Sequence, residues 1–222
     1  IIGRSGAGKT VLLKLLVGLL TPTSGKIWYN DTDFCNLNKR DLRAIRMKVG
    51  MLFQASALFD SMTVEENIRF PLDMFTNMTK KEKLDRVNYC LERVSLEGVN
   101  SKYPSETSGG MQKRVGIARA IVLDPEYLFC DEPNSGLDPK TSIVIDELIR
   151  SITEEKQITT IINTHDMNSV MEIGDNIILL HLGEIAWRGN KTEVLESNNE
   201  ILRNFIFASP FLQRLRDTAL EK

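Results

Sequence analysis

The residues whose types and spacing most clearly predict chemistry stand at the start of the chain. They form the stretch Gly3-Arg4-Ser5-Gly6-Ala7-Gly8-Lys9-Thr10, which is followed by an apolar helical pattern. Glycines at this spacing let successive backbone N–H groups turn inward around phosphate oxygens, and the following helix directs its positive dipole end at the same anion. We expect Lys9 to reach the β- and γ-phosphates of a nucleoside triphosphate and Thr10 to place its hydroxyl on Mg²⁺.

A pair of carboxylates, Asp131-Glu132, ends an apolar run that starts at Tyr127. Such a pair is by itself most often a solvated strand end, because charged residues usually lie at the surface. Downstream of a phosphate loop, however, it supplies what hydrolysis needs. Asp131 can hold Mg²⁺, directly or through water, and Glu132 can align and polarise the attacking water.

The bulk composition is ordinary for a globular protein, and the net charge gives no general electrostatic reason to expect nucleic acid. The chain has 222 residues, of which 42% are hydrophobic and 26% charged, and its net charge is -2. The cysteines Cys35, Cys90 and Cys130 are odd in number and scattered, which favours a reducing compartment over a disulfide framework. The longest apolar run, 11–20, is too short to cross a bilayer.

Apolar strand-like runs that alternate with helical patterns predict a mainly parallel α/β sheet. We expect strands at 26–29, 49–53, 127–130 and 158–164, the last buried because it is rich in β-branched residues, and a hairpin that turns at Leu182-Gly183. Helices are predicted to start after Asn38 and Asp138. Only Ile1-Ile2 precede the phosphate loop, so we expect the N-terminal strands of the fold to be missing from this sequence.

The middle of the chain has helical character. Thr63-x-x-Glu66 and Thr79-x-x-Glu82 both match the capping box that starts a helix. We therefore expect a helical lobe at 62–122, inserted between the core segments 1–61 and 123–198. A C-terminal helical tail is expected at 199–222, with an apolar face that includes Phe205, Phe207, Phe211, Leu212 and Leu215.

The turn Ser108-Gly109-Gly110, placed ahead of a helix and before the Asp-Glu pair, resembles the signature of ATP-binding-cassette (ABC) ATPases. The resemblance implies a P-loop NTPase (RecA-like) core with an inserted helical lobe, ATP and Mg²⁺ as cofactors, and ATP hydrolysis. It also implies a head-to-tail homodimer, in which Ser108 and Gly110 of one copy touch the γ-phosphate held by the other. Thr107 and Met111 stand where the family usually has Leu and Gln, but both only flank the Ser-Gly-Gly turn.

Other family positions match one by one. Gln54 resembles the glutamine of the Q-loop, a ligand that joins Mg²⁺ and the γ-phosphate to the helical lobe. The segment 135–138, which ends in Asp138, resembles the D-loop, which contacts the opposite subunit. His165 resembles the switch histidine. His181 has no such context and is interpreted as structural. The aromatic residue that stacks on adenine in this family would lie before residue 1.

The segment after Gln54 indicates a subtype. Its Leu-Phe-Gln, Ala-Leu-Phe and Phe-Pro-Leu elements resemble the ATPase of Mla/MCE-type lipid transporters. That resemblance implies a peripheral protein on the cytoplasmic face of the inner membrane, a permease docked near residues 54–75, and an MCE-type lipid-binding subunit as a further partner. The alternatives are the ATPase of a quaternary-amine, osmolyte or amino-acid importer and, more distantly, a cassette of translation or DNA repair.

Overall fold

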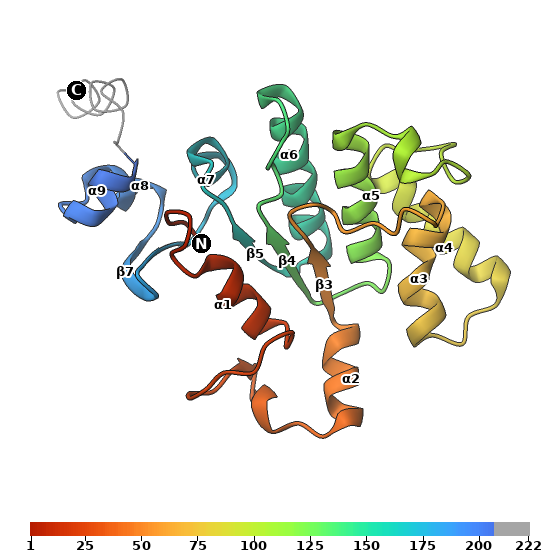
Figure 1. Ribbon diagram of the computed structural model, residues 1–222, viewed down its shortest axis with the longest axis horizontal. Coiled ribbons are helices and arrows are strands. Elements are labelled where there is room, and N and C mark those ends of the chain that lie inside the picture. The colour runs from red at the N-terminus through yellow and green to blue at the C-terminus, as the bar shows by residue number, and fades with distance from the viewer. Residues whose placement is uncertain (207–222) are drawn as a thin grey trace. The chain divides into compact units, whose positions relative to one another are not determined.

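The computed structural model describes residues 1–206, in two compact units (Figure 1). One unit joins Ile1–Leu12 to the described residues from Asn163 onward, and the other comprises Leu13–Ile162. We call them the smaller and the larger unit and describe each by itself. Of the predicted C-terminal tail, the described part contains helix α9 (Glu200–Ile206), whereas Phe207, Phe211, Leu212 and Leu215 lie outside the described residues.

The larger unit is built on a sheet with the strand order β3-β4-β5 (Figure 1). Strands β3 (Val49–Leu52) and β4 (Tyr127–Asp131) are parallel, and the register runs from Val49 opposite Tyr127 to Leu52 opposite Cys130. This confirms the parallel direction expected from the sequence. β5 (Thr159–Asn163) is expected from the sequence to be buried but is mostly half-buried, and among the strands that the structure describes it stands last in the order β3-β4-β5.

The helices predicted for the middle of the chain are α3 (Val64–Phe75), α4 (Lys80–Arg93) and α5 (Gly109–Ile121), with a 3-10 turn at Pro104–Glu106 between the last two. Both capping boxes form, since Thr63 and Thr79 each accept a bond from the N–H three residues on. All three helices pack against one another and α5 packs on β3, around a core of fully buried residues that includes Ile68, Leu91 and Ile117.

Helix α6 (Pro139–Lys156) begins as the sequence predicts, with Asp138 as N-cap and Pro139 as the first helical residue. Its buried positions Ile145, Ile149 and Ile152 join the same core. The spacing is four positions from Ile145 to Ile149 and three from Ile149 to Ile152, so all three residues share one face of the helix.

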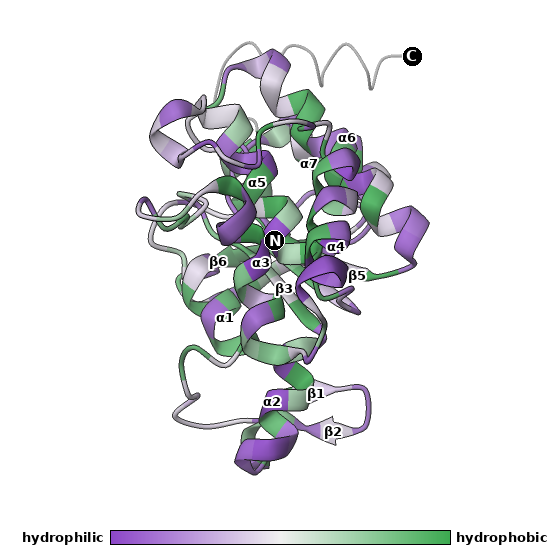
Figure 2. Ribbon diagram, turned by 90° about the vertical axis from the view of Figure 1, so that its right-hand side faces the viewer, coloured by the Kyte–Doolittle hydropathy of each residue, from purple (hydrophilic) through white to green (hydrophobic). Residues whose placement is uncertain are grey.

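The N-terminal part of the larger unit surrounds a second cluster that includes Leu13, Tyr29 and Phe129. It contains the short hairpin β1 (Trp28–Tyr29) and β2 (Thr32–Asp33), a 3-10 turn (Phe34–Asn36) and α2 (Lys39–Met47). Only Trp28 and Tyr29 of the strand expected at 26–29 pair. Asn38 caps α2 as predicted, and Figure 2 shows the mixed hydropathy of this helix, none of whose residues is buried.

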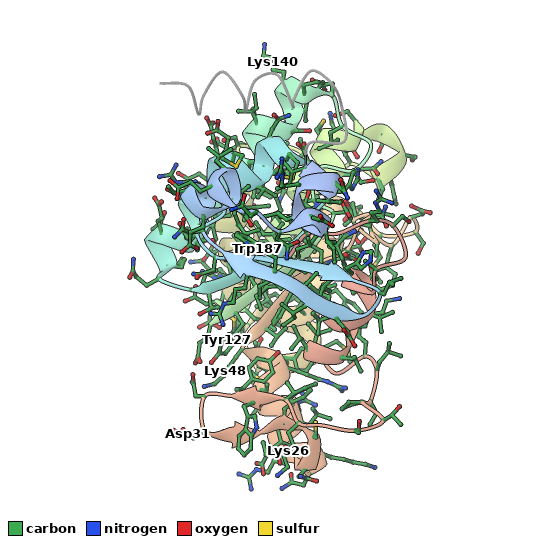
Figure 3. The ribbon with its side chains drawn as sticks, turned by 90° about the vertical axis from the view of Figure 1, so that its left-hand side faces the viewer. Lys26, Asp31, Lys48, Tyr127, Lys140 and Trp187 are labelled. Carbon is green, nitrogen blue, oxygen red and sulfur yellow. The ribbon has the colours of Figure 1, made fainter. Side chains whose placement is uncertain are left out.

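The smaller unit centres on the hairpin β6 (Ile177–His181) and β7 (Glu184–Gly189), which carries Trp187 (Figure 3). The predicted turn is confirmed: Leu182 and Gly183 both have positive φ, 51° and 84°, as the tight turn of a twisted hairpin requires. Its remaining helices are α7 (Met167–Ile173), α8 (Lys191–Glu196) and α9. Helix α1 (Lys9–Leu16) begins in this unit.

The residues just before the phosphate loop are strand-like. Ile2 forms a parallel bridge with Leu179, bonding through its N–H to Ile178 and through its carbonyl to Leu180. The loop is therefore anchored to β6. No helix among residues 1–206 has the length and apolarity needed to cross a membrane.

Candidate nucleotide-binding site

The phosphate loop owes its shape to three glycines. Gly3, Gly6 and Gly8 have φ values of 152°, 81° and 102°, where side chains other than glycine are strained. A Cβ on Gly3 would also lie 2.4 Å from the carbonyl oxygen of Leu180. The loop closes with a bond from the Ala7 N–H to the carbonyl of Arg4 at 3.1 Å, and α1 begins at Lys9. Arg4, Ser5 and Gly6 are exposed, so a ligand can reach the loop.

Lys9 is 8% exposed, and its ammonium donates a hydrogen bond to the carbonyl of Gly3 at 2.8 Å. The side chain therefore arches over the loop whose N–H groups are expected to bind phosphate. Thr10, half-buried, is the next residue of α1. The ammonium and the helix start supply the positive charge that a polyphosphate needs.

The smaller unit also places His165 close in structure to the beginning of the loop. Thr164 donates its N–H to the carbonyl of Ile1 at 3.0 Å, and His165 follows, exposed, directly before the N-cap Asp166 of α7. Two segments separated by most of the chain are thus joined. His181, interpreted as structural, is half-buried at the end of β6, opposite Glu184.

In the larger unit, Asp131 and Glu132 lie at the carboxyl end of β4. They are 4% and 8% exposed, so neither is the solvated strand end that an isolated pair suggests. Glu132 has φ 49°, a left-handed conformation that is uncommon for a glutamate and occurs mostly where surrounding contacts impose it. Its carbonyl accepts the N–H of Ser135 at 3.1 Å.

Gln54 follows β3 by one residue and is exposed. Its amide Nε2 donates to Ser135 Oγ at 3.3 Å, and its backbone carbonyl accepts a hydrogen bond from the buried amine of Lys113. The ends of the neighbouring parallel strands β3 and β4 therefore meet, as Figure 1 shows, and bring Gln54 and the segment after Glu132 together.

The Ser-Gly-Gly turn forms the start of α5. Ser108 is the N-cap and accepts the N–H of Met111 on its Oγ at 3.3 Å. A Cβ on Gly110 would lie 2.8 Å from Thr141 Cγ2 on α6, so a larger residue does not fit there without a shift. Ser108 and Gly109 are exposed, which leaves the turn open to a ligand from outside.

Asp138 caps α6 next to this turn, since a Cβ on Gly109 would lie 3.9 Å from Leu137. Its carboxylate accepts hydrogen bonds from the hydroxyl and the N–H of Thr141, which hold the pKa of Asp138 below its ordinary value. An ionised carboxylate at a helix N-terminus is favoured by the helix dipole.

Lys113 is the residue of this region that sequence reasoning missed. It is 4% exposed, on the face of α5 that also carries the buried Ile117 and Ile121. The signal was present in the sequence: a lysine at four-residue spacing with apolar residues falls on the face of the helix expected to be buried.

The residues present fit ATP and Mg²⁺. In the smaller unit the loop offers N–H donors and an ammonium for phosphate oxygens, and Thr10 carries a hydroxyl. In the larger unit Gln54 and Asp131 carry amide and carboxylate oxygens of the kind that Mg²⁺ prefers. Within the larger unit, the structure brings together Gln54, Asp131-Glu132 and the start of the 135–138 segment. Within the smaller unit, it joins the loop Gly3–Thr10 to the segment of His165.

Comparison with known proteins shows the family and the fold of the chain. A family model described as "ABC transporter" matches residues 1–135. The dimeric structure of the ATP-binding cassette MJ0796 bound to ADP and Pi has 33% sequence identity and a TM-score of 0.78, covering 86% of this chain and 83% of that chain. A second dimeric structure of MJ0796, described as a bacterial ABC transporter cassette, has a TM-score of 0.79 with the same identity and coverage.

Among curated relatives, the "probable ribonucleotide transport ATP-binding protein mkl" of Mycobacterium leprae is 40% identical over 206 residues, 93% of this chain and 59% of that protein. "Methionine import ATP-binding protein MetN 2" of Oceanobacillus iheyensis is 40% identical over 207 residues, 93% of this chain and 60% of that protein. The chain thus spans about three fifths of the length of these relatives. Its α/β architecture is that of the P-loop cassette fold.

Proposed function

The chain belongs to the ABC transporter family, and on that premise we propose that it is the ATP-binding and ATP-hydrolysing subunit of an ABC transporter. The observation that carries the proposal is the phosphate loop with Lys9 over it, combined with a buried Asp131-Glu132 pair at the end of β4. A loop alone would support nucleotide binding, whereas the buried carboxylates supply the groups that hydrolysis requires.

Each residue has a specific part in the proposed reaction. Lys9 and the N–H groups of 3–10 bind the β- and γ-phosphates of ATP. Glu132 accepts a hydrogen bond from the attacking water and orients it, and His165 senses the γ-phosphate. Mg²⁺, when bound, neutralises charge on the phosphates, and Thr10, Gln54 and Asp131 are the residues that would hold it.

The proposed working form is a homodimer in which Ser108, Gly109 and Gly110 of one copy complete the nucleotide site of the other, and Asp138 lies at the contact. The exposed position of the Ser108 turn at the start of α5 supports this, because the positive end of a helix dipole favours an anion there. The two MJ0796 structures are described as dimeric, which supports a dimer by similarity.

The surface after Gln54 is proposed to receive a short helix of a membrane permease. Phe59 is 43% exposed and its ring lies 5.1 Å from that of Phe70. Met74, on the same helix as Phe70, is 54% exposed. Together they offer the apolar contact that an amphipathic helix needs.

The conformation of this surface depends on the buried Asn67. Its Oδ1 accepts the N–H of Phe59 at 2.8 Å, and its Nδ2 donates to the carbonyls of Phe59, Met62 and Thr63 at 3.0–3.1 Å. A surface held in this way is available to a partner without first being ordered, which lowers the cost of binding.

For the transported substrate we propose a lipid, with an MCE-type lipid-binding subunit as a further partner and the inner membrane's cytoplasmic face as the location. The resemblance of the segment 51–72 to Mla/MCE-type ATPases supports this. The second candidate is an amino-acid importer, which the name of the methionine-import relatives supports. In either case residues 62–122 are proposed to act as the helical lobe between the core segments 1–61 and 123–198.

The test is affinity purification of the full-length protein from membranes, followed by subunit identification and lipid analysis. We expect an integral membrane permease and co-purified phospholipid, and an importer would instead bring a permease without enriched lipid. Phe59→Asp should abolish permease recovery, whereas Leu195→Asp, at 39% exposure on α8, should not. Recovery of ribosomes or DNA in place of a permease would contradict the transporter assignment.

A further inference from the structure

One face of α5 holds the segment that follows β3. Near the start of this helix, the amine of Lys113 donates a hydrogen bond to the backbone carbonyl of Gln54. One turn further, Gly116 leaves so little room that an added Cβ would lie 3.3 Å from Ser56 Cβ and 2.8 Å from Leu52 Cδ1. Near the end of the helix, Arg119 donates to the carbonyls of Ser56 and Ala57, the latter at 2.8 Å.

This contact compensates for an unfavourable backbone. Ser56 and Ala57 both have positive φ, 59° and 47°, although neither is a glycine. Such residues cost free energy and persist only where neighbouring groups fix them. The bonds from α5 therefore determine the path of the chain immediately after Gln54.

The Lys113 amine also contacts the segment that contains Glu132. Lys113 Nζ donates to the carbonyl of Glu132 at 3.4 Å, so one buried cation contacts the backbone of both Gln54 and Glu132. Glu132 is itself left-handed, and its carbonyl is held by Lys113 and by the Ser135 N–H. Two residues in different segments are in this way tied to α5, whose first residues form the Ser108 turn.

Burying an ammonium is costly unless it is well hydrogen-bonded. Burial lowers the pKa of Lys113, while the neighbouring Cys130, Glu132 and Asp131 oppose that shift. An apolar residue would fill this place in the core without that cost. The lysine is therefore best explained by the two carbonyls that it holds.

We propose that Lys113 is a positioning residue for ATP hydrolysis, which fixes the Gln54 amide and the Glu132 carboxylate relative to each other and to the Ser-Gly-Gly turn of the same helix. This inference rests on the proposed function. It assigns a mechanical role to α5. When the Ser108 turn docks against a second copy, the resulting movement of α5 reaches Gln54 and Glu132 through the Lys113 side chain.

The test compares Lys113→Met, which keeps an unbranched side chain one atom shorter but removes its donors, with Lys113→Arg, which keeps a donating cation. The full-length protein is assayed for kcat, KM and equilibrium binding of ATP. We expect Lys113→Met to lower kcat about tenfold to hundredfold, since a hydrogen bond from a charged group is lost, while its Kd for ATP stays within about threefold. Lys113→Arg should recover most of the kcat.

The matched control is Arg86→Met. Arg86 donates to the carbonyls of Val122 and Ile121, at 2.8 and 3.1 Å, so it too ties a helix to two backbone carbonyls of the larger unit, but none of them belongs to the site. The Arg86→Met protein should have a lower thermal stability than the wild type, and its kcat in the folded state should be unchanged. Gly116→Ala adds a Cβ that would crowd Leu52 Cδ1 and, less closely, Ser56 Cβ, while leaving Lys113 in place, so we expect it to lower both thermal stability and kcat.

Hydrogen–deuterium exchange gives a readout that does not depend on catalysis. Amide exchange in 54–57 and 132–135 should be faster in Lys113→Met and unchanged in Arg86→Met. A normal kcat in Lys113→Met, an equal loss of kcat in Arg86→Met, or no recovery in Lys113→Arg would overturn the proposal. If instead the wild type hydrolyses no ATP, the proposed function fails, and faster exchange in both segments would still support the positioning contact.

Discussion

The Nε2 atom of Gln54 donates a hydrogen bond to Ser135 Oγ at 3.3 Å, which joins the end of β3 to the segment that follows Glu132. These residues are 81 positions apart in the chain. Their contact exists because β3 and β4 are adjacent parallel strands whose carboxyl ends lie at one edge of the sheet.

Lys9→Ala should weaken ATP binding itself. Two unit charges about 4 Å apart interact by roughly 4 kcal/mol at an effective dielectric of 20, and only part of this is recovered by solvent. We expect the Kd for ATP, measured by isothermal titration calorimetry, to rise at least about tenfold. Lys14→Ala, an exposed lysine one turn along α1, should leave it unchanged. An unchanged affinity in Lys9→Ala would remove Lys9 from its proposed part.

Glu132→Gln should keep ATP binding and lose turnover. The amide has nearly the same size as the carboxylate and can occupy the same buried place, but it no longer accepts a proton from water. We expect steady-state phosphate release to fall by about a hundredfold or more with little change in Kd. Rapid phosphate release by this variant would contradict the assignment of Glu132.

Asn67→Ala should destabilise the protein more than the loss of a few side-chain atoms would suggest. The buried amide satisfies four backbone groups of the 59–63 turn, and truncation leaves them without partners. We expect the free energy of unfolding in urea to fall by about 2–4 kcal/mol. The control Asn88→Ala removes an exposed hydrogen bond to Asn100 and should cost less than about 0.5 kcal/mol.

Stability should fall in acid partly through Asp124. Burial alone would raise the pKa of this carboxyl, but Lys156 and Arg86 bond to it and hold the pKa below its ordinary value of 3.8. A folded-state pKa below the unfolded one gives stability that is present above the unfolded pKa and is lost as pH falls through the folded pKa.

Asp124→Asn tests this without disturbing the turn, because asparagine tolerates the positive φ of 57° at this position. The difference in Tm between wild type and variant should be largest near neutral pH and shrink below about pH 4. Asp60→Asn, an exposed carboxyl elsewhere, serves as control. A constant difference across the pH range would show that the ion pairs do not account for the effect.

The sequence predicted what depends on local chemistry. The capping boxes of Thr63 and Thr79, the Asn38 and Asp138 caps and the Leu182-Gly183 turn each involve residues within a few positions, so their patterns are legible in the chain. The parallel direction of the sheet was also predicted, because apolar runs alternate with helical patterns, but the pairing of β3 with β4 was not.

Long-range contacts were not predictable in the same way. The two carbonyls held by Lys113, the left-handed backbone of Glu132 and the four bonds of Asn67 arise only when distant segments pack. The burial of β5 was overestimated, because composition does not reveal where a strand stands in the sheet. Sequence motifs thus predict which groups react, and the structure shows which contacts hold the segments that carry them.

The measurement that tests the central claim most directly is the ATP-dependent association of the full-length Glu132→Gln protein, followed by light scattering with and without Ser108→Asp. Aspartate keeps the N-cap of α5 but adds a negative charge where the γ-phosphate of a second copy is expected. We predict a monomer without ATP, a dimer with ATP, and no ATP-dependent dimer when Ser108→Asp is added. A dimer that forms equally well with Ser108→Asp, or no dimer at saturating ATP, would contradict the account.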